Sequence, residues 1–389
     1  MKVLLIALES IDNRGDEIIR ESTEYLVKQI LNDVEILRAQ LKPSKTTIDK
    51  KYLFCYSLGA ILWKLSSWTT GNFSYKIKNL SYVIKYSRYF STNIRHSDKI
   101  ILPVGMLKYS TQDFSYMFHL INKFATKYGK PVLMSAMSPQ PADNSDWRYL
   151  QLIKAVNMPA VCMLTTRDGE AGVNVLSSDY IKRNLHCTSV GDPALWIPEV
   201  YRIKGTKTCN EVPYVGINII RNGIFDDYNK ALTDDAMFNI YVQLIKSLED
   251  IGWRWSVFTN GMEKDNVVLR ELKKHLGFSE DHVIPPCKNG AKYAEMISCY
   301  DVVFGARLHA CITSVAVGTP VVGFIWDNKL RHFSETMKIT QFFFQPSEMT
   351  AEKIVKKMKE ALNYNFDIKN RDRYKQKTRD SIKYFLASL

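Results

Sequence analysis

The chain places an arginine and a histidine two residues apart, a pairing that suits the binding and protonation of an anion. Arg307 and His309 lie in the stretch DVVFGARLHACITSVAVGTPVVGFIW, which runs from Asp301 to Trp326. An arginine presents a planar fork of N–H donors that matches a carboxylate or a phosphate, and a histidine can hold or transfer a proton near neutral pH. The pair therefore predicts an anion site with a proton donor beside it.

The elements that must position this pair are predicted to be a strand, a helix and a second strand. Residues 301–304 and 321–325 are short apolar runs typical of buried strands, and Gly318 and Pro320 end the helix between them. That helix opens at Arg307, and the free N–H groups of a helix N-terminus favour anions. Parallel α/β sheets bind ligands beyond the carboxyl ends of their strands, which is where this pair falls.

A second polar motif follows the first predicted strand, at residues 2–8. Asn13, Gly15 and Asp16 belong to the run NRGDE, which leads into a helical pattern. Asn13 or Asp12 is suited to cap that helix, and Gly15 permits a tight turn or a close approach to a ligand. Acidic residues in the first turn also suit the helix dipole, so a purely structural interpretation stays open.

The run GARLHACI, followed by GTPVVGFIWDNK, resembles the C-terminal signature of the polysaccharide pyruvyl transferase family, and NRGDE resembles its first strand–helix junction. Members transfer pyruvate from phosphoenolpyruvate to a sugar as a ketal. The resemblance covers nearly the whole chain and is patchy between residues 43 and 98. The chain departs from the family before Asn13, where Ser10-Ile11-Asp12 replaces the usual glycine.

The resemblance implies a donor site in the second half of the chain. Arg221 and Arg307 would hold the carboxylate and phosphate of phosphoenolpyruvate. His309 would act as the general acid or as a phosphate ligand, and Lys329 would contact the phosphate. A solvated surface lysine is the alternative interpretation of Lys329.

The resemblance also implies roles for the N-terminal motif. Asn13 and Gly15 would contribute to donor binding, and Asp16 would orient or deprotonate an acceptor hydroxyl from the other domain. No metal is expected, because no metal-ligand spacing is visible in the sequence. No resident cofactor is expected either, since phosphoenolpyruvate is itself the donor substrate.

Apolar strand patterns alternate with helical patterns throughout the chain, which is typical of a parallel, doubly wound α/β sheet. The predicted strands are 2–8, 34–37, 99–104, 131–136, 159–164, 188–190, 214–220, 253–259, 282–284, 301–304, 321–325 and 342–344. We expect two Rossmann-like domains in a GT-B arrangement, with a C-terminal helix returning to the N-terminal domain and ligands in the cleft between the domains.

The expected domain boundaries follow the breaks in this pattern. The N-terminal domain, on the acceptor side, would span residues 1–205 with an insertion at about 43–98. The C-terminal domain, on the donor side, would span 206–362 after a linker that begins at Gly205, and the returning helix would occupy 363–389.

Composition favours a globular protein with an anionic partner. The formal net charge is +13, and 46% of the 389 residues are hydrophobic. The seven scattered cysteines form no C-x-x-C pair, which indicates neither a zinc site nor a disulfide framework and favours a reducing compartment. MKVLLIALES is typical of a strand rather than of a signal peptide, so we expect a cytoplasmic protein, with the inner face of the membrane as its candidate place of association.

The insertion is rich in aromatic and basic residues. Between Lys51 and Phe90 the sequence has eleven aromatic and six basic residues and no acidic one. This composition suits peripheral contact with an anionic membrane, and it equally suits an aromatic core helix with a solvated basic face. Single-stranded nucleic acid is a third possibility that we do not favour, and we expect no nucleic-acid partner.

Two other functions compete with pyruvyl transfer. A GT-B glycosyltransferase that uses a nucleotide sugar would share the fold and the basic residues, and Glu295 or Glu335 is available to bind the ribose of its donor. A non-catalytic binder of an anionic polymer is the other. The acceptor of a pyruvyl transferase would be a sugar, either lipid-linked or polymeric.

Overall fold

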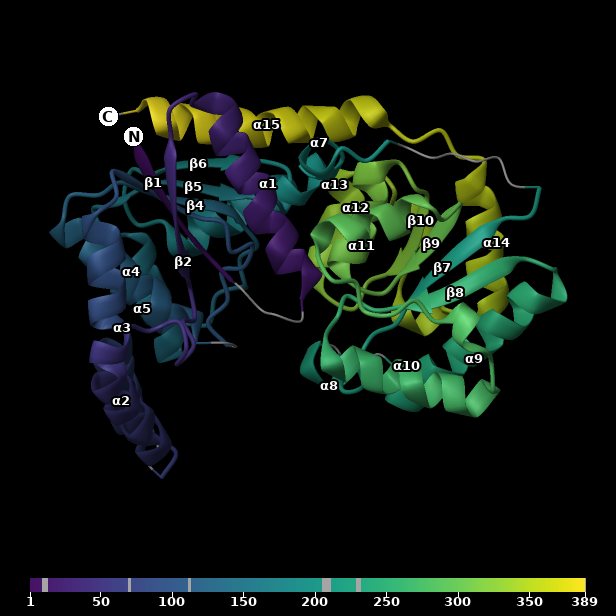
Figure 1. Cartoon of the computed structure of the whole chain (residues 1–389), viewed down its shortest axis with the longest axis horizontal. Helices are drawn as coiled ribbons and strands as arrows, with labels where there is room; N and C mark the ends of the chain where they lie inside the picture. The colour runs from purple at the N-terminus through teal and green to yellow at the C-terminus, as the bar shows by residue number, and fades with distance from the viewer. Residues whose placement is uncertain (9–12, 69–70, 111–112, 205–210, 229–231, 389) are drawn as a thin grey trace. The chain divides into compact units, whose positions relative to one another are not determined.

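A computed structural model describes residues 1–8, 13–68, 71–110, 113–204, 211–228 and 232–388 (Figure 1). The chain divides into two compact units, each built on one parallel sheet with flanking helices. Unit 1 comprises Met1–Glu9, Thr23–Val190 and Lys377–Leu389, and unit 2 comprises Ser10–Ser22 and Gly191–Gln376. This confirms the prediction of two Rossmann-like domains.

The sheet of unit 1 has six parallel strands in the order β2-β1-β3-β4-β5-β6. They are β1 (Lys2–Ala7), β2 (Glu35–Gln40), β3 (Lys99–Leu102), β4 (Val132–Met137), β5 (Val161–Thr166) and β6 (His186–Ser189). Every residue of β3 and β4 is buried, as expected for the central strands of a parallel sheet that is covered on both faces.

The helices of unit 1 include two that the sequence did not resolve. They are the second half of α1 (Arg14–Ile30), α2 (Leu53–Ser66), α3 (Gly71–Arg95), α4 (Phe114–Lys127), α5 (Trp147–Val156) and α6 (Gly169–Val175). The predicted insertion is the pair α2 and α3, which run side by side away from the sheet (Figure 1). Tyr82, Tyr86 and Phe90 of α3 are buried in the core of unit 1, so this part of the insertion belongs to the domain.

The sheet of unit 2 has five parallel strands in the order β11-β10-β9-β7-β8. They are β7 (Tyr214–Asn218), β8 (Arg254–Phe258), β9 (Val302–Gly305), β10 (Val321–Phe324) and β11 (Phe343–Phe344). The strand predicted at 282–284 is wrong, because Val283 makes only an isolated bridge to Val257. The chain order reverses between β7 and β9, which is the topological switch point where such sheets bind ligands.

Helices cover the sheet of unit 2 between its strands. They are α7 (Ile197–Tyr201), α8 (Ile224–Tyr228), α9 (Asp234–Asp250), α10 (Glu263–Leu276), α11 (Gly290–Ser298), α12 (Leu308–Val317), α13 (Asn328–Thr336), α14 (Ala351–Leu362) and the first half of α15 (Ile368–Ala387). Gly318 ends α12 in the left-handed region at φ 83°, as the sequence predicts.

The two units differ from the predicted domains in their boundaries. Unit 2 begins at Gly191 rather than at residue 206, because Ala194, Leu195 and Ile197 are buried in its core. Unit 2 also includes the start of α1, because Ile18 is buried in the core of unit 2. The predicted linker from Gly205 lies outside the described residues.

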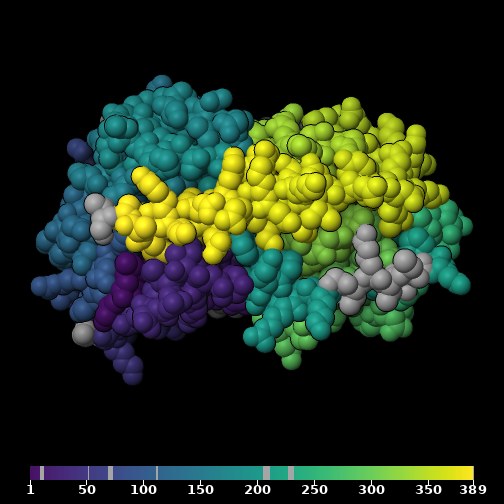
Figure 2. Space-filling view, turned by 90° about the horizontal axis from the view of Figure 1, so that it is seen from above, coloured from purple at the N-terminus to yellow at the C-terminus, as the bar shows by residue number. Residues whose placement is uncertain are grey.

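The C-terminal helix returns to the N-terminal domain, as predicted. The last turns of α15, yellow in Figure 2, lie on the surface of unit 1. The buried ammonium of Lys99 donates hydrogen bonds to the carbonyl oxygens of Phe385, Leu386 and Ser388 at 2.9, 2.8 and 2.6 Å. These are carbonyls that the end of a helix leaves without intrahelical partners, so the lysine from β3 caps α15. None of the described helices combines the length and apolar composition needed to span a bilayer.

Candidate active site

Four of the predicted site residues follow three neighbouring strands of unit 2. Arg221 comes three residues after β7, Arg307 and His309 follow β9, and Lys329 follows β10. The sheet order places β10 beside β9 and β9 beside β7. Since the strands are parallel and neighbours lie about 4.8 Å apart, these loops share one edge of the sheet. They flank the switch point, so the predicted anion site falls where the fold binds ligands.

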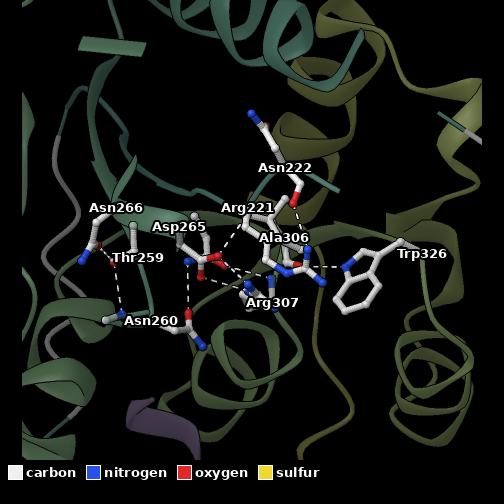
Figure 3. Close-up of polar contacts among 12 residues, drawn as sticks. Arg221, Asn222, Thr259, Asn260, Asp265, Asn266, Ala306, Arg307 and Trp326 are labelled. Carbon is white, nitrogen blue, oxygen red and sulfur yellow. Dashed lines mark hydrogen bonds and ion pairs between the residues drawn. The ribbon is translucent and has the colours of Figure 1, made fainter. Parts of the chain in front are cut away.

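Asp265, in the first turn of α10, fixes both arginines of this edge (Figure 3). Its carboxylate accepts a hydrogen bond from Nε of Arg307 at 3.0 Å and a second from Nη2. The same carboxylate accepts the backbone N–H of Arg221 at 2.9 Å. Asp265 is fully buried and the Arg307 side chain is 14% exposed, so this ion pair is screened little by water. Sequence reasoning did not single out Asp265.

The bidentate pairing leaves part of the Arg307 guanidinium for a ligand. Nε and Nη2 use one edge of the planar fork, whereas Nη1 donates no hydrogen bond to any residue that the structure describes. The backbone N–H of Arg307 is also engaged, because it donates to the Asn218 side chain at 2.9 Å. The carboxylate therefore orients the guanidinium while one face of its fork stays available to an anion.

The guanidinium of Arg221 folds over the turn that follows it. Its Nη1 donates to the backbone oxygen of Asn222 at 2.9 Å, beside Gly223, whose backbone lies in the left-handed region at φ 73°. A Cβ at Gly223 would meet this Nη1 at 3.3 Å, so the glycine leaves room for the arginine to fold over the turn. Asp265 thus fixes Arg221 through its backbone and Arg307 through its side chain.

A buried hydrogen-bond network connects Arg307 to the N-terminal motif. Asn218 at the end of β7 donates through Nδ2 to the side-chain oxygen of Asn260 at 3.1 Å, and the Tyr293 hydroxyl donates to that oxygen at 2.8 Å. The backbone oxygen of Asn260 accepts the backbone N–H of Arg14 at 3.1 Å. Asn218 and Asn260 are almost fully buried. Asn260 directly follows the predicted strand 253–259, and that position is the signal by which the sequence could have found it, whereas Asn218 lies inside the predicted strand 214–220.

The N-terminal motif is organised by Asn13. Its side-chain oxygen accepts the backbone N–H of Gly15 at 3.1 Å, which confirms Asn13 as a cap of α1, whereas Asp12 lies outside the described residues. Its Nδ2 donates to the carboxylate of Asp16 at 3.0 Å. Arg14 pairs with Glu17 at 2.5 Å. The expectation that Asp16 comes from the other domain is wrong, because the start of α1 belongs to the same unit as Arg307.

The imidazole of His309 lies directly against Gly15. A Cβ built on Gly15 would fall inside 3.0 Å of three ring atoms of His309, closer than real Cβ atoms come to other atoms. His309 is partly buried in the first turn of α12. The two motifs that the sequence predicted to be functional, almost 300 residues apart, therefore meet through a glycine and an imidazole.

Lys329 is positioned rather than solvated. Its side chain is 14% exposed, and its ammonium lies 3.2 Å from the carboxylate of Asp327. Asp327 also caps α13 by accepting the backbone N–H of Lys329 at 3.1 Å. The alternative of a solvated surface lysine is therefore wrong.

Unit 1 gathers polar residues at the carboxyl edge of its own sheet. Ser138 after β4 donates its hydroxyl to the carboxylate of Asp168 at 2.5 Å, and both are buried. The guanidinium of Arg167, also buried, approaches Gly105 after β3 so closely that a Cβ there would meet Nη1 at 2.9 Å. The structure thus brings the ends of β3, β4 and β5 together through buried polar side chains.

No cluster of three or more His, Cys, Asp or Glu side chains within the described ranges is arranged to hold a metal ion.

Comparison with family models decides the classification. The model for polysaccharide pyruvyl transferase matches residues 13–328, most of the chain. The chain belongs to the polysaccharide pyruvyl transferase family. It is therefore a transferase, and the match includes the NRGDE motif as well as Arg307 and His309. Comparison with curated protein sequences finds no significant match.

Solved structures similar to this family member have the GT-B fold. UDP-GlcNAc 2-epimerase from Methanocaldococcus jannaschii is 15% identical with a TM-score of 0.57, and each chain is covered completely. The Neisseria meningitidis enzyme bound to UDP-GlcNAc is 11% identical, with a TM-score of 0.57 and 99% of each chain covered. A trehalose-phosphate synthase (UDP-forming) from Burkholderia vietnamiensis is 10% identical, with a TM-score of 0.50 and coverage of 99% and 97%. At these identities the likeness shows the fold alone and confirms the predicted fold class.

Proposed function

We propose that the protein transfers pyruvate from phosphoenolpyruvate to two hydroxyl groups of a sugar and forms a ketal. The observation that carries the proposal is the anchoring of Arg221 and Arg307 on Asp265 beside His309. A donor with a carboxylate and a phosphate requires two cationic sites, and a buried carboxylate that orients a guanidinium preorganises one of them. Family membership supports the same reaction.

In this proposal the arginines bind the donor and His309 protonates it. Arg307 contacts an anionic group of phosphoenolpyruvate through Nη1, and Arg221 contacts the other, with Lys329 reaching the phosphate. Asn13 and Gly15 shape the N-terminal side of the donor site. His309 gives a proton to C3 of the enol, which makes C2 electrophilic. The contact with Gly15 holds the imidazole in one place for this step.

The atoms balance through two additions at C2. The first sugar hydroxyl adds to C2, the bond from C2 to the phosphate oxygen breaks, and the second hydroxyl adds to close the ketal. Of the two hydroxyl protons, one replaces the proton that His309 gave to C3 and the other leaves with phosphate. Asp16, whose carboxylate accepts a hydrogen bond from Asn13, is the proposed group that orients or deprotonates the attacking hydroxyl.

We place the reaction in the biosynthesis of a surface polysaccharide, capsular or exopolysaccharide, on a lipid-linked or oligosaccharide acceptor. The protein would work in the cytoplasm in peripheral contact with the inner face of the membrane. The net charge of +13 supports an anionic surface as a partner.

Binding of phosphoenolpyruvate tests the proposal without knowledge of the acceptor. A ligand at a hundredfold excess over its Kd raises the unfolding free energy by about 2.7 kcal/mol if it binds the folded state alone. We expect phosphoenolpyruvate to raise the thermal unfolding temperature of the wild type and to lose most of this effect in Arg307→Ala. Arg270→Ala, on the exposed side of α10, is the matched control and should respond as the wild type does.

Two outcomes would contradict the proposal. Stabilisation by a nucleoside diphosphate but not by phosphoenolpyruvate would favour a glycosyltransferase. Of the acidic residues available for such a donor, Glu295 is engaged with Lys292 at 2.7 Å on the surface of α11, which does not favour this alternative. An equal response of Arg307→Ala and Arg270→Ala would place the donor elsewhere.

A further inference from the structure

The helix α2 presents an apolar stripe to solvent. Seven of the fifteen large hydrophobic side chains that are exposed in the described part of the chain lie between residues 54 and 80. Five of them form the outer stripe, which consists of Phe54, Leu58, Ile61, Leu65 and Trp68. At 100° per residue the first four positions fall within about 60° around the helix axis. Phe54 is 77% and Trp68 84% exposed, so the ends of the stripe are almost fully open.

Folding of the α2–α3 pair does not need this stripe. The opposite face of α2 packs on α3, where the rings of Trp63 and Tyr82 meet edge to face at 5.3 Å. The pair is also joined by a hydrogen bond from the Ser81 hydroxyl to the backbone oxygen of Gly59 at 2.6 Å. A Cβ at Gly59 would lie 2.8 Å from the backbone oxygen of Ser81, so the two helices approach each other closely at this glycine. The inner face is therefore complete, and the outer stripe is an additional surface.

The charge of the pair is strongly positive. Residues 50–97 contain eight lysines and arginines and no aspartate or glutamate. Lys64 adjoins the stripe on α2, and Lys76 and Arg88 are exposed on α3. Other basic side chains lie over inner rings, as Lys78 does over Trp63 at 5.3 Å and Lys85 over Tyr56 at 4.6 Å. The apolar stripe thus belongs to a segment without acidic residues and is bordered by cations.

An apolar stripe bordered by basic side chains favours an anionic partner over a second copy of the chain. A second copy of the chain would bring the same positive charge to the stripe, and like charges across an interface repel. An anionic bilayer surface attracts the lysines and arginines near it and accepts aromatic side chains at the headgroup level. Long lysine stems can lie along the apolar surface while the ammonium contacts phosphate.

We propose that the outer stripe of α2 docks on an anionic lipid bilayer, with the lysines beside it contacting the headgroups. The inference rests on the membrane contact in the proposed function and names the surface that makes it. Because the described helices are too polar or too short to cross a bilayer, the contact is with the headgroup boundary rather than with the whole membrane thickness.

The test is flotation of the full-length protein with vesicles, with no donor or acceptor present. Vesicles of phosphatidylcholine alone are compared with vesicles that also contain phosphatidylglycerol, at low and high salt. We expect binding to the anionic vesicles, weakened by salt. Phe54→Ser/Ile61→Ser/Trp68→Ser should bind at least about tenfold less, since burial of each exposed ring or aliphatic chain in lipid favours binding.

Matched controls distinguish binding through the outer stripe from nonspecific binding through other exposed hydrophobic or basic residues. Leu150→Ser/Val267→Ser/Ile368→Ser removes three other exposed hydrophobic side chains and should bind vesicles as the wild type does. Lys64→Glu/Lys76→Glu should lose binding, whereas Lys274→Glu on α10 should keep it. If the triple variant does not fold, Trp68→Ser alone tests the stripe, because Trp68 lies beyond the last residue of α2.

Three results would overturn the proposal. The wild type could fail to float with anionic vesicles at low salt, or the stripe variant and its control could bind equally. The wild type could also form a dimer that the stripe variant loses, which would make the stripe a self-association surface. Stabilisation by phosphoenolpyruvate is measured separately and should be unchanged in the stripe variant, so failure of docking and failure of pyruvyl transfer are distinguishable.

Discussion

Gly15 and His309 are in direct contact, and the contact depends on the absence of a side chain at residue 15. Any Cβ there would overlap the imidazole ring. The backbone N–H of Gly15 donates a hydrogen bond to the side chain of Asn13. The backbone N–H of the preceding residue, Arg14, donates to the backbone oxygen of Asn260. Neither the backbone nor the ring can therefore move aside without breaking a hydrogen bond or shifting α12.

Gly15→Ala should displace the imidazole and weaken the proposed donor site. Overpacking of a fixed contact typically costs about 1–3 kcal/mol of stability. We expect a lower thermal unfolding temperature and a smaller stabilisation by phosphoenolpyruvate, both measured by thermal unfolding with and without the ligand. If Gly15→Ala had the wild-type unfolding temperature and the wild-type stabilisation by phosphoenolpyruvate, the imidazole of His309 would be able to move away from residue 15 at no cost.

The double variant Gly15→Ala/His309→Ala is the control for this mechanism. Removal of the ring removes the overlap, so the stability lost in Gly15→Ala should be largely regained in the double variant. Ligand stabilisation should not return in full, because the imidazole that lines the proposed donor site is missing. A double variant that is as unstable as the sum of the two single variants would contradict a direct clash.

Asp265→Ala should destabilise unit 2 strongly. It leaves the Arg307 guanidinium buried without its carboxylate and removes the acceptor of the Arg221 backbone N–H. Loss of one partner of a buried ion pair costs about 3–5 kcal/mol. Denaturant unfolding measures this cost, and Glu263→Ala in the same helical turn is the control. Because Glu263 pairs with Arg270 in solvent, its removal should cost less than about 1 kcal/mol.

The residues with functional patterns were predictable, and their internal partners were not. Arg307, His309 and Lys329 each follow an apolar strand pattern, and the parallel order of strands brings such positions to one edge of a sheet. Asp265 carries no comparable signal, because an acidic residue in the first turn of a helix is already explained by the helix dipole. Its pairing with Arg307 depends on packing between α10 and the end of β9, which local sequence does not encode.

The division of α1 between the two units was likewise not predictable from the sequence. Its residues continue one helical pattern, so the sequence gives no reason to divide it. The division arises because Ile18 is buried in the core of unit 2, whereas Leu26 and Val27 are buried beyond Thr23, in unit 1. The prediction that Asp16 comes from the other domain failed for this reason. The α2–α3 insertion was predicted by composition, but its apolar stripe became visible only once the inner face was known.

Glu24→Gln should lower stability at neutral pH and have little effect in acid. Burial alone would raise the pKa of Glu24, but hydrogen bonds from Arg38 and Lys28 outweigh it and hold the pKa below its ordinary value of 4.5. A carboxyl whose folded pKa is lowered stabilises the fold above its unfolded pKa and loses this contribution as the pH falls through the folded pKa. We expect a difference of about 1–3 kcal/mol at pH 7, measured by denaturant unfolding.

The pH profile separates this ion pair from a packing effect. The difference between the wild type and Glu24→Gln should shrink as the pH falls below 4.5. Glu35→Gln is the control, because Glu35 and Lys2 form an exposed pair with side chains 56% and 50% exposed. Its removal should change stability little at any pH. A difference for Glu24→Gln that stays constant into acid would show that the amide is simply packed badly.

Lys99→Met should loosen the end of α15. The methionine keeps the apolar part of the side chain but removes the ammonium that donates to the carbonyls of Phe385, Leu386 and Ser388. Burial of an ammonium is costly, yet three hydrogen bonds to carbonyls at the negative end of a helix dipole should outweigh that cost. We expect a loss of about 1–3 kcal/mol by denaturant unfolding and faster proteolysis of the C-terminal residues. Lys383→Met on the exposed face of α15 should change neither, and a Lys99→Met variant as stable as the wild type would show that packing alone holds the helix.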